Sequence, residues 1–161
     1  MDFSNIGDAE LVLLRNDVER EMKARKISFS VGEIGEKIAI NFFCSNPKFT
    51  NLYAAQTGTK NVDAFSRDGE RYSIKTAQKA KKTGTIYPDS ENLNKQLFEH
   101  LIIVMLSEEF TLEYLFLFSW QDFIKIRAWD KRMNAWYVPI SKKRLKLGLS
   151  LYDKENDDVR K

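Results

Sequence analysis

Residues 60–76 read KNVDAFSRDGERYSIKT, and this stretch decides the interpretation of the whole chain. Two segments with strand-like composition flank Asp68-Gly69, a dipeptide typical of tight turns, so the stretch predicts a β-hairpin. The hairpin carries Asp63 in its first arm and Lys75 in its second, both among apolar neighbours. A purely structural hairpin is not expected to place charges there, so both residues are candidates for chemistry.

The length of the turn decides whether the two charges share a face. With a two-residue loop, Asp63 lies opposite Ile74 and points away from Lys75. With a three-residue loop whose glycine adopts the left-handed conformation, Asp63 lies opposite Ser73, and Lys75 becomes a diagonal neighbour on the same face. The sequence allows both registers, and only the second assembles a site.

Two helices are expected before the hairpin. Apolar residues at helical spacing predict an amphipathic helix over 8–26, and a second helix follows over 31–44. Ser30 and Glu33 form the capping-box pattern at the start of the second helix. On that helix Glu36 lies between large apolar side chains. It either pairs with a nearby lysine or points into a polar pocket at the sheet, and Glu36 is preferred over Glu33 for function because Glu33 has a capping role.

The other segments complete a mixed fold. Strands are expected over 52–58, 61–66, 71–77, 100–106 and 111–119, a short helix over 90–98, and a third helix from 119 through 136. The order is roughly ααβββαββα, which indicates a single α/β or α+β domain over residues 1–150. A polar tail, expected to fray, occupies 151–161.

Composition limits the class of protein. The chain has 161 residues, 43% of them hydrophobic, which is enough for one domain with a real core. A net charge of +3 permits a nucleic-acid partner without demanding one. A lone cysteine, Cys44, allows no disulfide within the chain and suits a reducing compartment. The longest aliphatic run, 101–106, is too short to cross a bilayer, and the N-terminus lacks signal-peptide features. We therefore expect a cytoplasmic protein without membrane contact.

The residue types suggest metal-assisted hydrolysis of a phosphodiester. Carboxylates such as Glu36 and Asp63 are hard oxygen ligands that suit Mg²⁺ or Mn²⁺. A metal beside a phosphodiester polarises the phosphorus and makes a bound water more acidic. A fixed ammonium such as that of Lys75 can stabilise the developing negative charge and orient the attacking water.

The run GEIGEKIAINFF (32–43), followed by NVDAFSRDGERYSIKT, resembles the PD-(D/E)XK nuclease superfamily. The likeness is to small restriction-endonuclease-like and junction-resolvase-like domains and covers roughly residues 30–120. It implies a mixed central sheet flanked by helices and metal-dependent cleavage of DNA. By this resemblance Glu36 and Asp63 are catalytic metal ligands, the carbonyl of Ile74 is a further ligand, and Lys75 is catalytic.

Ser73 departs from the pattern of that family, which has an acid or an amide two residues before the lysine. A serine hydroxyl lacks the charge of a carboxylate but can reach a metal-bound water. Some members with a Ser-x-Lys signature take the missing acid from a later helix, and here Asp89 and Glu91 are candidates, although acids at a helix N-terminus are ordinary caps. Two alternatives stay open: Glu36 and Asp63 suffice for one metal, or the site is inactive and the domain only binds DNA or protein.

Basic residues in two segments are candidates for phosphate contacts. They are Arg71 in the second arm of the hairpin, Lys79, Lys81 and Lys82 in the loop after it, and Arg127, Lys131 and Arg132 in the segment 125–146. The second segment is either a solvated helix face or an element that contacts DNA or a second subunit. DNA is the expected partner, with RNA left open. A homodimer is expected because one small site cuts one strand at a time.

Overall fold

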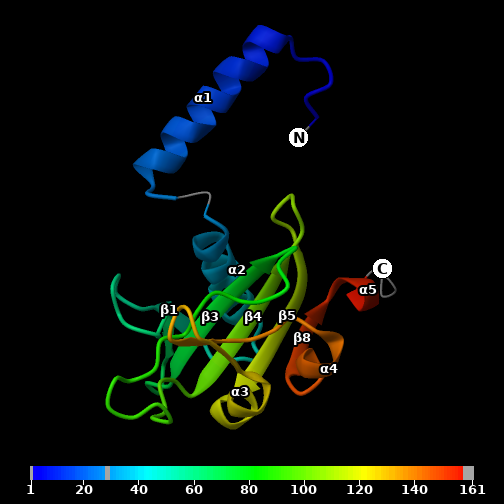
Figure 1. Ribbon diagram of the computed structural model, residues 1–161. Coiled ribbons are helices and arrows are strands. Elements are labelled where there is room, and N and C mark those ends of the chain that lie inside the picture. The colour runs from blue at the N-terminus through cyan, green and yellow to red at the C-terminus, as the bar shows by residue number, and fades with distance from the viewer. Residues whose placement is uncertain (1, 28–29, 158–161) are drawn as a thin grey trace.

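A six-stranded sheet with helices on both faces organises the computed structural model, which describes residues 2–27 and 30–157 (Figure 1). The strand order is β1-β2-β3-β4-β5-β8; β3 and β4 are parallel and the other neighbours are antiparallel. The strands are β1 (Leu52–Ala54), β2 (Ala64–Ser66), β3 (Arg71–Gln78), β4 (His100–Leu106), β5 (Leu112–Ser119) and β8 (Leu149–Asp153). The expected mixed sheet is thereby confirmed at the level of an α+β fold.

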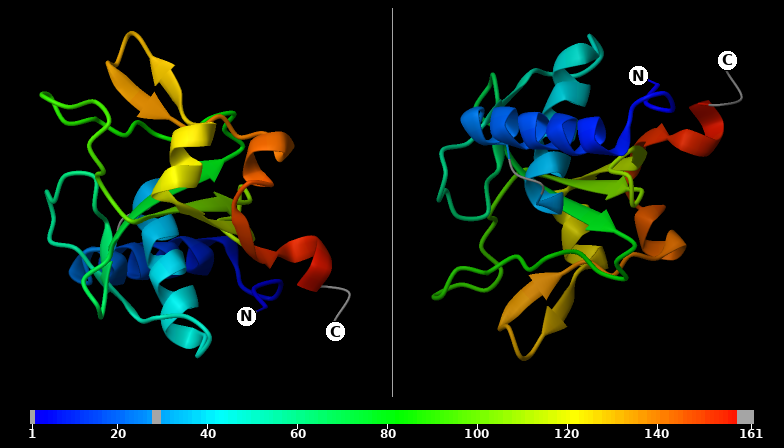
Figure 2. Two further views of the ribbon diagram at one scale, coloured as in Figure 1. Left: turned by 90° about the horizontal axis from the view of Figure 1, so that it is seen from below. Right: turned by 90° about the horizontal axis from the view of Figure 1, so that it is seen from above.

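The helices are α1 (Asp8–Ala24), α2 (Val31–Ser45), α3 (Trp120–Ile126), α4 (Lys142–Leu145) and α5 (Lys154–Asp157). A separate two-stranded hairpin consists of β6 (Ala128–Asp130) and β7 (Ala135–Tyr137). Figure 2 shows α2 on one side of the sheet and α3 with the β6–β7 hairpin on the other. Among the described residues, no helix is long and apolar enough to span a membrane.

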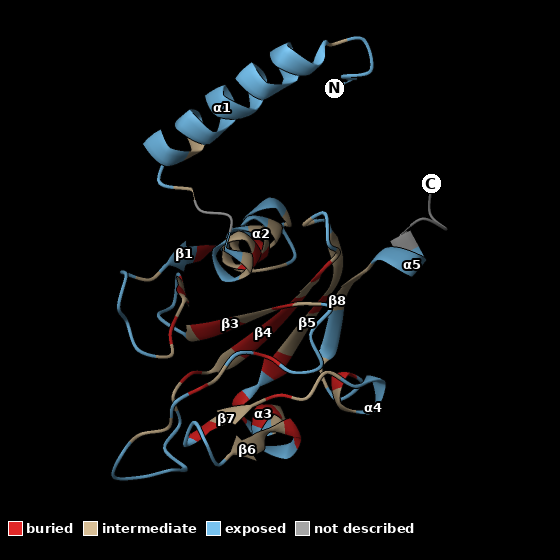
Figure 3. Ribbon diagram, turned by 45° about the horizontal axis from the view of Figure 1, so that its top comes forward, coloured by how far each residue is buried: buried red, intermediate tan, exposed pale blue. Residues whose placement is uncertain are grey.

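Two apolar cores sandwich the sheet. Phe43 of α2 packs with Ile102 of β4 on one face, whereas Phe123 of α3 packs with Leu101 and Ile103 on the other. Because β4 is covered on both faces, its sequence is continuously apolar instead of alternating. Figure 3 shows this buried centre between the two layers.

Capping chemistry places α2 where the sequence predicts it. The hydroxyl oxygen of Ser30 accepts a hydrogen bond from the backbone N–H of Glu33 at 3.2 Å. This bond satisfies one of the free N–H groups at the helix start. The bounds of α1, β3, β4 and β5 likewise agree with the expected elements to within one or two residues, whereas β1 and β2 are shorter than expected.

The expected helix from 119 through 136 is wrong beyond Ile126. Arg127 has an extended backbone, and β6 and β7 follow. Asp130 Oδ1 accepts from the N–H groups of Arg132 and Met133, and Asn134 has φ +48°, which is the turn chemistry of a hairpin. A short-range turn therefore prevails over the helical spacing of the apolar residues.

The C-terminal segment adds an edge strand to the sheet. β8 pairs with β5, so the sheet continues past the expected boundary at residue 150. Gly148, just before β8, lies against Phe118, and a Cβ added there would be 2.5 Å from that ring. The end of the expected tail, 158–161, lies outside the described residues.

Candidate active site

The hairpin has the three-residue connection 67–69. The N–H of Ser66 donates to the carbonyl of Glu70 at 2.9 Å, and the glycine of the turn has φ +84°. Ala64 pairs with Tyr72 in the resulting ladder. The glycine supplies the left-handed conformation that a side chain would oppose. The two-residue alternative is therefore wrong.

This register brings Asp63 to the edge of β3. Its Oδ2 accepts from the backbone N–H of Ile74 at 2.6 Å and from the hydroxyl of Ser73 at 3.4 Å. Because N–H and C=O of one strand residue point to the same side, the carbonyl of Ile74 also faces the edge near Asp63. No donor among the described residues reaches Oδ1 of Asp63, so this oxygen is available to a metal.

The hydroxyl of Ser73 contacts Asp63 and does not face solvent. Its side chain is fully buried, with 0% of its surface exposed. The hydroxyl donates to Asp63, which leaves Ser73 as a positioning residue. It therefore does not occupy the place of the missing acid as a direct ligand.

Glu36 is positioned by an unusually close contact between α2 and β3. A Cβ added to Gly35 would lie 1.9 Å from Oγ1 and 2.7 Å from Cβ of Thr76, so only glycine allows this approach. Glu36 follows directly, so this close approach also holds the backbone of α2 at Glu36 near β3. Sequence analysis missed this role of Gly35; its only signal is a glycine inside an otherwise strong helical pattern.

Electrostatics links Glu36 to the hairpin. Burial raises the pKa of Glu36, the negative charge of Asp63 raises it further, and the positive charge of Lys75 opposes the rise. Like charges disfavour ionisation and opposite charges favour it, so these shifts show that the three groups lie within electrostatic reach. The three residues expected from the sequence to form one site thus influence one another's charge in the folded chain.

Lys75 approaches the region from the other face of β3. Alternation along the strand places Ser73 and Lys75 on the face of α3, and Ile74 and Thr76 on the face of α2. β2 pairs only with Arg71 and Tyr72 of β3, so its ladder ends before Ser73. Glu36, on α2, and Lys75 thus approach β3 from opposite faces, and the charge of Lys75 still acts on the pKa of Glu36.

The donor set of this edge fits a hard divalent cation. It consists of two carboxylates, from Glu36 and Asp63, and the carbonyl of Ile74. A cation would relieve the repulsion that raises the pKa of Glu36. No group of three or more histidine, cysteine, aspartate or glutamate side chains with metal-binding geometry occurs among residues 2–27 and 30–157. The candidate site depends on a main-chain ligand for its third oxygen.

The expected helix over 90–98 is wrong, and Asp89, just before it, serves a turn instead. Asp89 Oδ1 accepts from the N–H groups of Glu91 and Asn92, and its Oδ2 accepts from Lys95 Nζ at 2.9 Å. These bonds lower the pKa of Asp89. Side chains of this type offer the backbone an alternative to a helix. The carboxylate of Asp89 thus already accepts three hydrogen bonds from its own segment.

Several expected phosphate-binding cations have protein partners. Arg71 forms a bidentate ion pair with Glu99, in which Nη2 donates to Oε1 at 2.6 Å and Nε donates to Oε2 at 3.0 Å. This pair lowers the pKa of Glu99 to about 2. Lys79 Nζ forms an ion pair with Glu108 Oε1, in the β4–β5 turn, at 2.6 Å. Lys82 pairs with Asp130 at 3.1 Å. The guanidinium of Arg71 is thus bound by Glu99, and Lys79 and Lys82 likewise have acidic partners.

Arg127 is packed between elements on the α3 side. Its guanidinium lies 3.8 Å from the ring centre of Trp136, and Nη2 donates to Asn94 Oδ1 at 2.9 Å. Burial lowers its pKa. Arg127 thus joins the hairpin β6–β7 to the segment before β4.

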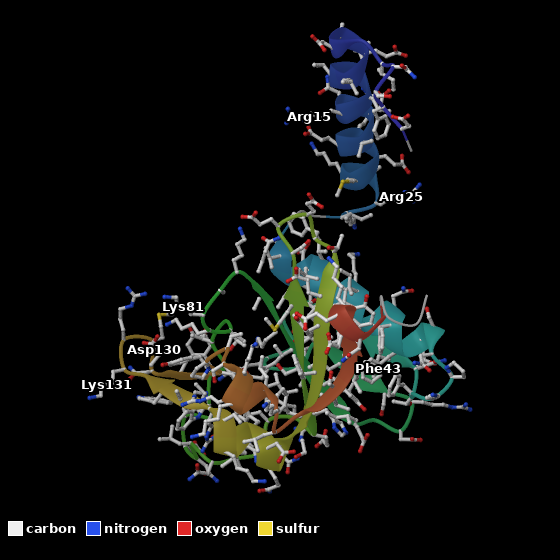
Figure 4. All side chains as sticks on the ribbon, turned by 90° about the vertical axis from the view of Figure 1, so that its right-hand side faces the viewer. Arg15, Arg25, Phe43, Lys81, Asp130 and Lys131 are labelled. Carbon is white, nitrogen blue, oxygen red and sulfur yellow. The ribbon has the colours of Figure 1, made fainter. Side chains whose placement is uncertain are left out.

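The two basic segments converge although they are far apart in sequence. The backbone of residues 81–86 forms hydrogen bonds with the backbone of 136–140. The N–H of Thr83 donates to the carbonyl of Val138, and Ile86 and Trp136 each donate an N–H to the carbonyl of the other. Figure 4 shows Lys81, Asp130 and Lys131 at one corner of the molecule. In the described part of the chain Lys81, Lys131 and Arg132 take part in no ion pair, so their charges are available.

Two adjoining hollows extend from the hairpin towards β6–β7. The larger, of about 420 Å³, is lined by Lys60, Tyr87, Pro88, Asp89, Ser90, Leu93, Trp129 and Asn134. The smaller, of about 210 Å³, is lined by Lys60, Asn61, Val62, Arg71, Asp89, Lys95, Gln96 and Leu97. They share Lys60 and Asp89, and the smaller one ends at Val62, next to Asp63. The two hollows together form a groove that ends beside Val62, and Asp63 itself lines neither of them.

No protein-family model matches this chain, and the search of curated proteins finds no significant match.

Proposed function

We propose that this protein is a divalent-metal-dependent endodeoxyribonuclease of the PD-(D/E)XK type, acting in the cytoplasm. One arrangement supports the proposal: Asp63 Oδ2 is fixed at the edge of β3 by the N–H of Ile74, and Glu36 follows Gly35 at the close contact of α2 with β3. Burial and then the charge of Asp63 raise the pKa of Glu36, and Lys75 opposes the rise. Two repelling carboxylates beside a lysine form a charge pattern that suits a metal and a phosphate. The resemblance in sequence to the PD-(D/E)XK superfamily assigns functional roles to the same three residues, Glu36, Asp63 and Lys75.

Each residue has a role in this proposal. Glu36, Asp63 and the carbonyl of Ile74 hold Mg²⁺ or Mn²⁺, which polarises the phosphodiester and makes a bound water more acidic. Lys75 stabilises the negative charge that develops on the phosphate and orients the attacking water. Ser73 and the N–H of Ile74 keep Asp63 oriented.

DNA is proposed to cross the corner formed by the two basic segments. Lys81, Lys131 and Arg132 would contact phosphates, which gives affinity without base readout and a strong dependence on salt. Aromatic side chains of the larger hollow, Tyr87 and Trp129, lie beside this route. The proposed path leads from these cations through the groove to Asp63.

A single incubation tests the activity. Supercoiled plasmid is expected to be nicked or linearised with Mg²⁺ or Mn²⁺ and to stay intact with EDTA. The second candidate function is a silent nuclease-like module that binds DNA or protein, favoured by the buried serine at the acid position of the signature. Retained DNA binding without cleavage under either metal would support this second function and exclude the first.

Glu36→Gln is expected to weaken metal binding and to stabilise the metal-free protein slightly. The raised pKa of Glu36 means that the folded state holds its proton more tightly, so the carboxylate lowers stability as pH rises through the interval above 4.5. After discounting for solvent screening we expect a gain below about 1 kcal/mol at pH 7. Thermal unfolding with and without Mg²⁺ measures both effects.

The control for this variant is Glu109→Gln, at an exposed position in the β4–β5 turn. It should unfold like the wild type and gain the same stability from Mg²⁺. Equal stabilisation of wild type and Glu36→Gln by Mg²⁺ would remove Glu36 from the metal site. The metal-dependent stabilisation of the wild type should also decline as pH falls and Glu36 becomes protonated.

Ser73→Ala is expected to reduce cleavage only about threefold to tenfold. The lost bond to Asp63 is long, at 3.4 Å, and the stronger bond from Ile74 remains. Initial rates at saturating Mg²⁺ measure the change. The matched control is Ser66→Ala, a buried serine of the same hairpin whose hydroxyl accepts from Glu70 N–H, and its rate should be unchanged. Complete loss in Ser73→Ala would show that the hydroxyl takes part directly.

A further inference from the structure

Helix α1 is an exposed element that the domain does not use for its own core. Its 17 residues include none that is buried. Figures 1 and 3 show it standing away from the sheet, exposed along nearly its whole length. An isolated helix of this length is marginal in water, so its stability calls for a packing partner.

Four apolar side chains of α1 form a stripe whose spacing is nearly the same in both chain directions. Leu11, Leu14, Val18 and Met22 follow one another at spacings of three and four, which places them on one face. Leu14 is 36% exposed and Val18 49%. Read from either end, the stripe presents a similar series of apolar side chains, so it can match a reversed copy of itself.

We propose that α1 packs antiparallel against α1 of a second copy of this chain. Leu11 would then lie against Met22 of the other copy, and Leu14 against Val18. Such a contact is isologous, since each copy contributes the same surface under two-fold symmetry. Knobs-into-holes packing along a stripe of this kind is the usual geometry for two helices.

Charge complementarity selects this partner and orientation. The first turn of α1 is acidic, with Asp8 and Glu10, and the last turn has Lys23. These three side chains form no ion pair with the described residues, whereas each of the other charges of α1 pairs with a residue three or four positions away, in one case Arg25 just beyond the helix. An antiparallel arrangement brings acidic and basic ends together and opposes the helix dipoles. A parallel one would place like charges side by side.

The first test is the mass of the intact chain in solution. Sedimentation equilibrium at about 100 μM, suited to a small and therefore weak interface, should give twice the monomer mass of 18.8 kDa. Leu14→Glu/Val18→Glu should halve this mass. The matched control, Val12→Glu/Leu13→Glu, changes one valine and one leucine that lie off the stripe, are 58% and 64% exposed, and should remain dimeric. A monomeric wild type, or a stripe variant that stays dimeric, would overturn the proposal.

The second test fixes the orientation. Leu11→Cys and Met22→Cys are made separately in a Cys44→Ser background, because Cys44 is exposed. In the antiparallel pair, the two copies of position 11 are about 16 Å apart along the axis, beyond the reach of a disulfide. Oxidation of a mixture should therefore give crosslinked dimers, and oxidation of either variant alone should not. Crosslinking of each variant alone would indicate a parallel pair and contradict the proposal.

This dimer is independent of the nuclease proposal, because mass and crosslinking require no activity. If both proposals hold, α1 joins two copies of the candidate active site, and each copy can cut one strand of a duplex. Loss of dimerisation with retained nicking would then separate the two results.

Discussion

Asp63→Asn is expected to lower metal-dependent cleavage of plasmid DNA by at least about 10²-fold. Asparagine has the shape of aspartate, and its oxygen can still accept the N–H of Ile74, which now bonds Asp63 at 2.6 Å. The variant removes the negative charge that attracts a cation, so the loss falls on metal binding and chemistry. Rates of nicking across a range of Mg²⁺ concentrations, together with the thermal unfolding midpoint, measure the effect.

Asp68→Asn is the matched control, since Asp68 lies exposed in the turn of the same hairpin. Its cleavage rate should equal that of the wild type. If Asp63→Asn and Asp68→Asn cleave equally well, the hairpin aspartate has no part in the reaction. A fold lost in Asp63→Asn would point instead to a structural role for the charge.

Lys75→Met should produce a comparable loss for a different reason. Methionine keeps much of the aliphatic chain but removes the ammonium that stabilises developing charge, which costs about 10²–10³-fold in related cases. Metal-dependent thermal stabilisation should persist because the oxygen ligands are intact. The control is Lys81→Met, at an exposed lysine outside the candidate site, which should weaken DNA binding, most strongly at low salt, and leave cleavage at saturating DNA unchanged.

Gly35→Ala is expected to destabilise the protein by about 1–3 kcal/mol and to reduce cleavage. The new methyl group would overlap Thr76, whose Cβ lies only 2.7 Å from the position of the added atom. Relief requires α2 to move away from β3, and Glu36 moves with it. Denaturant unfolding and cleavage rates measure the two consequences.

Gly32→Ala supplies the control on the same helix. A Cβ at position 32 meets nothing within 4 Å, so this variant should be more stable by about 0.5–1 kcal/mol through helix propensity. Thr76→Ala combined with Gly35→Ala removes two of the overlapping atoms and should recover part of the stability. A Gly35→Ala variant as stable as Gly32→Ala would show that the close approach of α2 and β3 does not affect the free energy of unfolding.

Local signals predicted the elements that carry the candidate site. The Ser30 cap and the helical spacing placed α2, and β-branched and apolar residues placed β3, β4 and β5, because these patterns act over a few residues. Local patterns predicted helices over 90–98 and 127–136 that the structure does not have. There, side chains such as Asp89 and Asp130 bond to nearby N–H groups and form turns that periodicity does not reveal.

By itself, the sequence determined the residue types of the candidate site and narrowed the hairpin to two registers. The tertiary structure decided between the registers, placed Glu36 at β3 through the contact of Gly35 with Thr76, and paired Arg71 with Glu99. The physical reason is distance along the chain. Patterns of spacing and capping act within one element, whereas the pKa of Glu36 depends on charges that lie 27 and 39 positions further on and meet it only in the folded state.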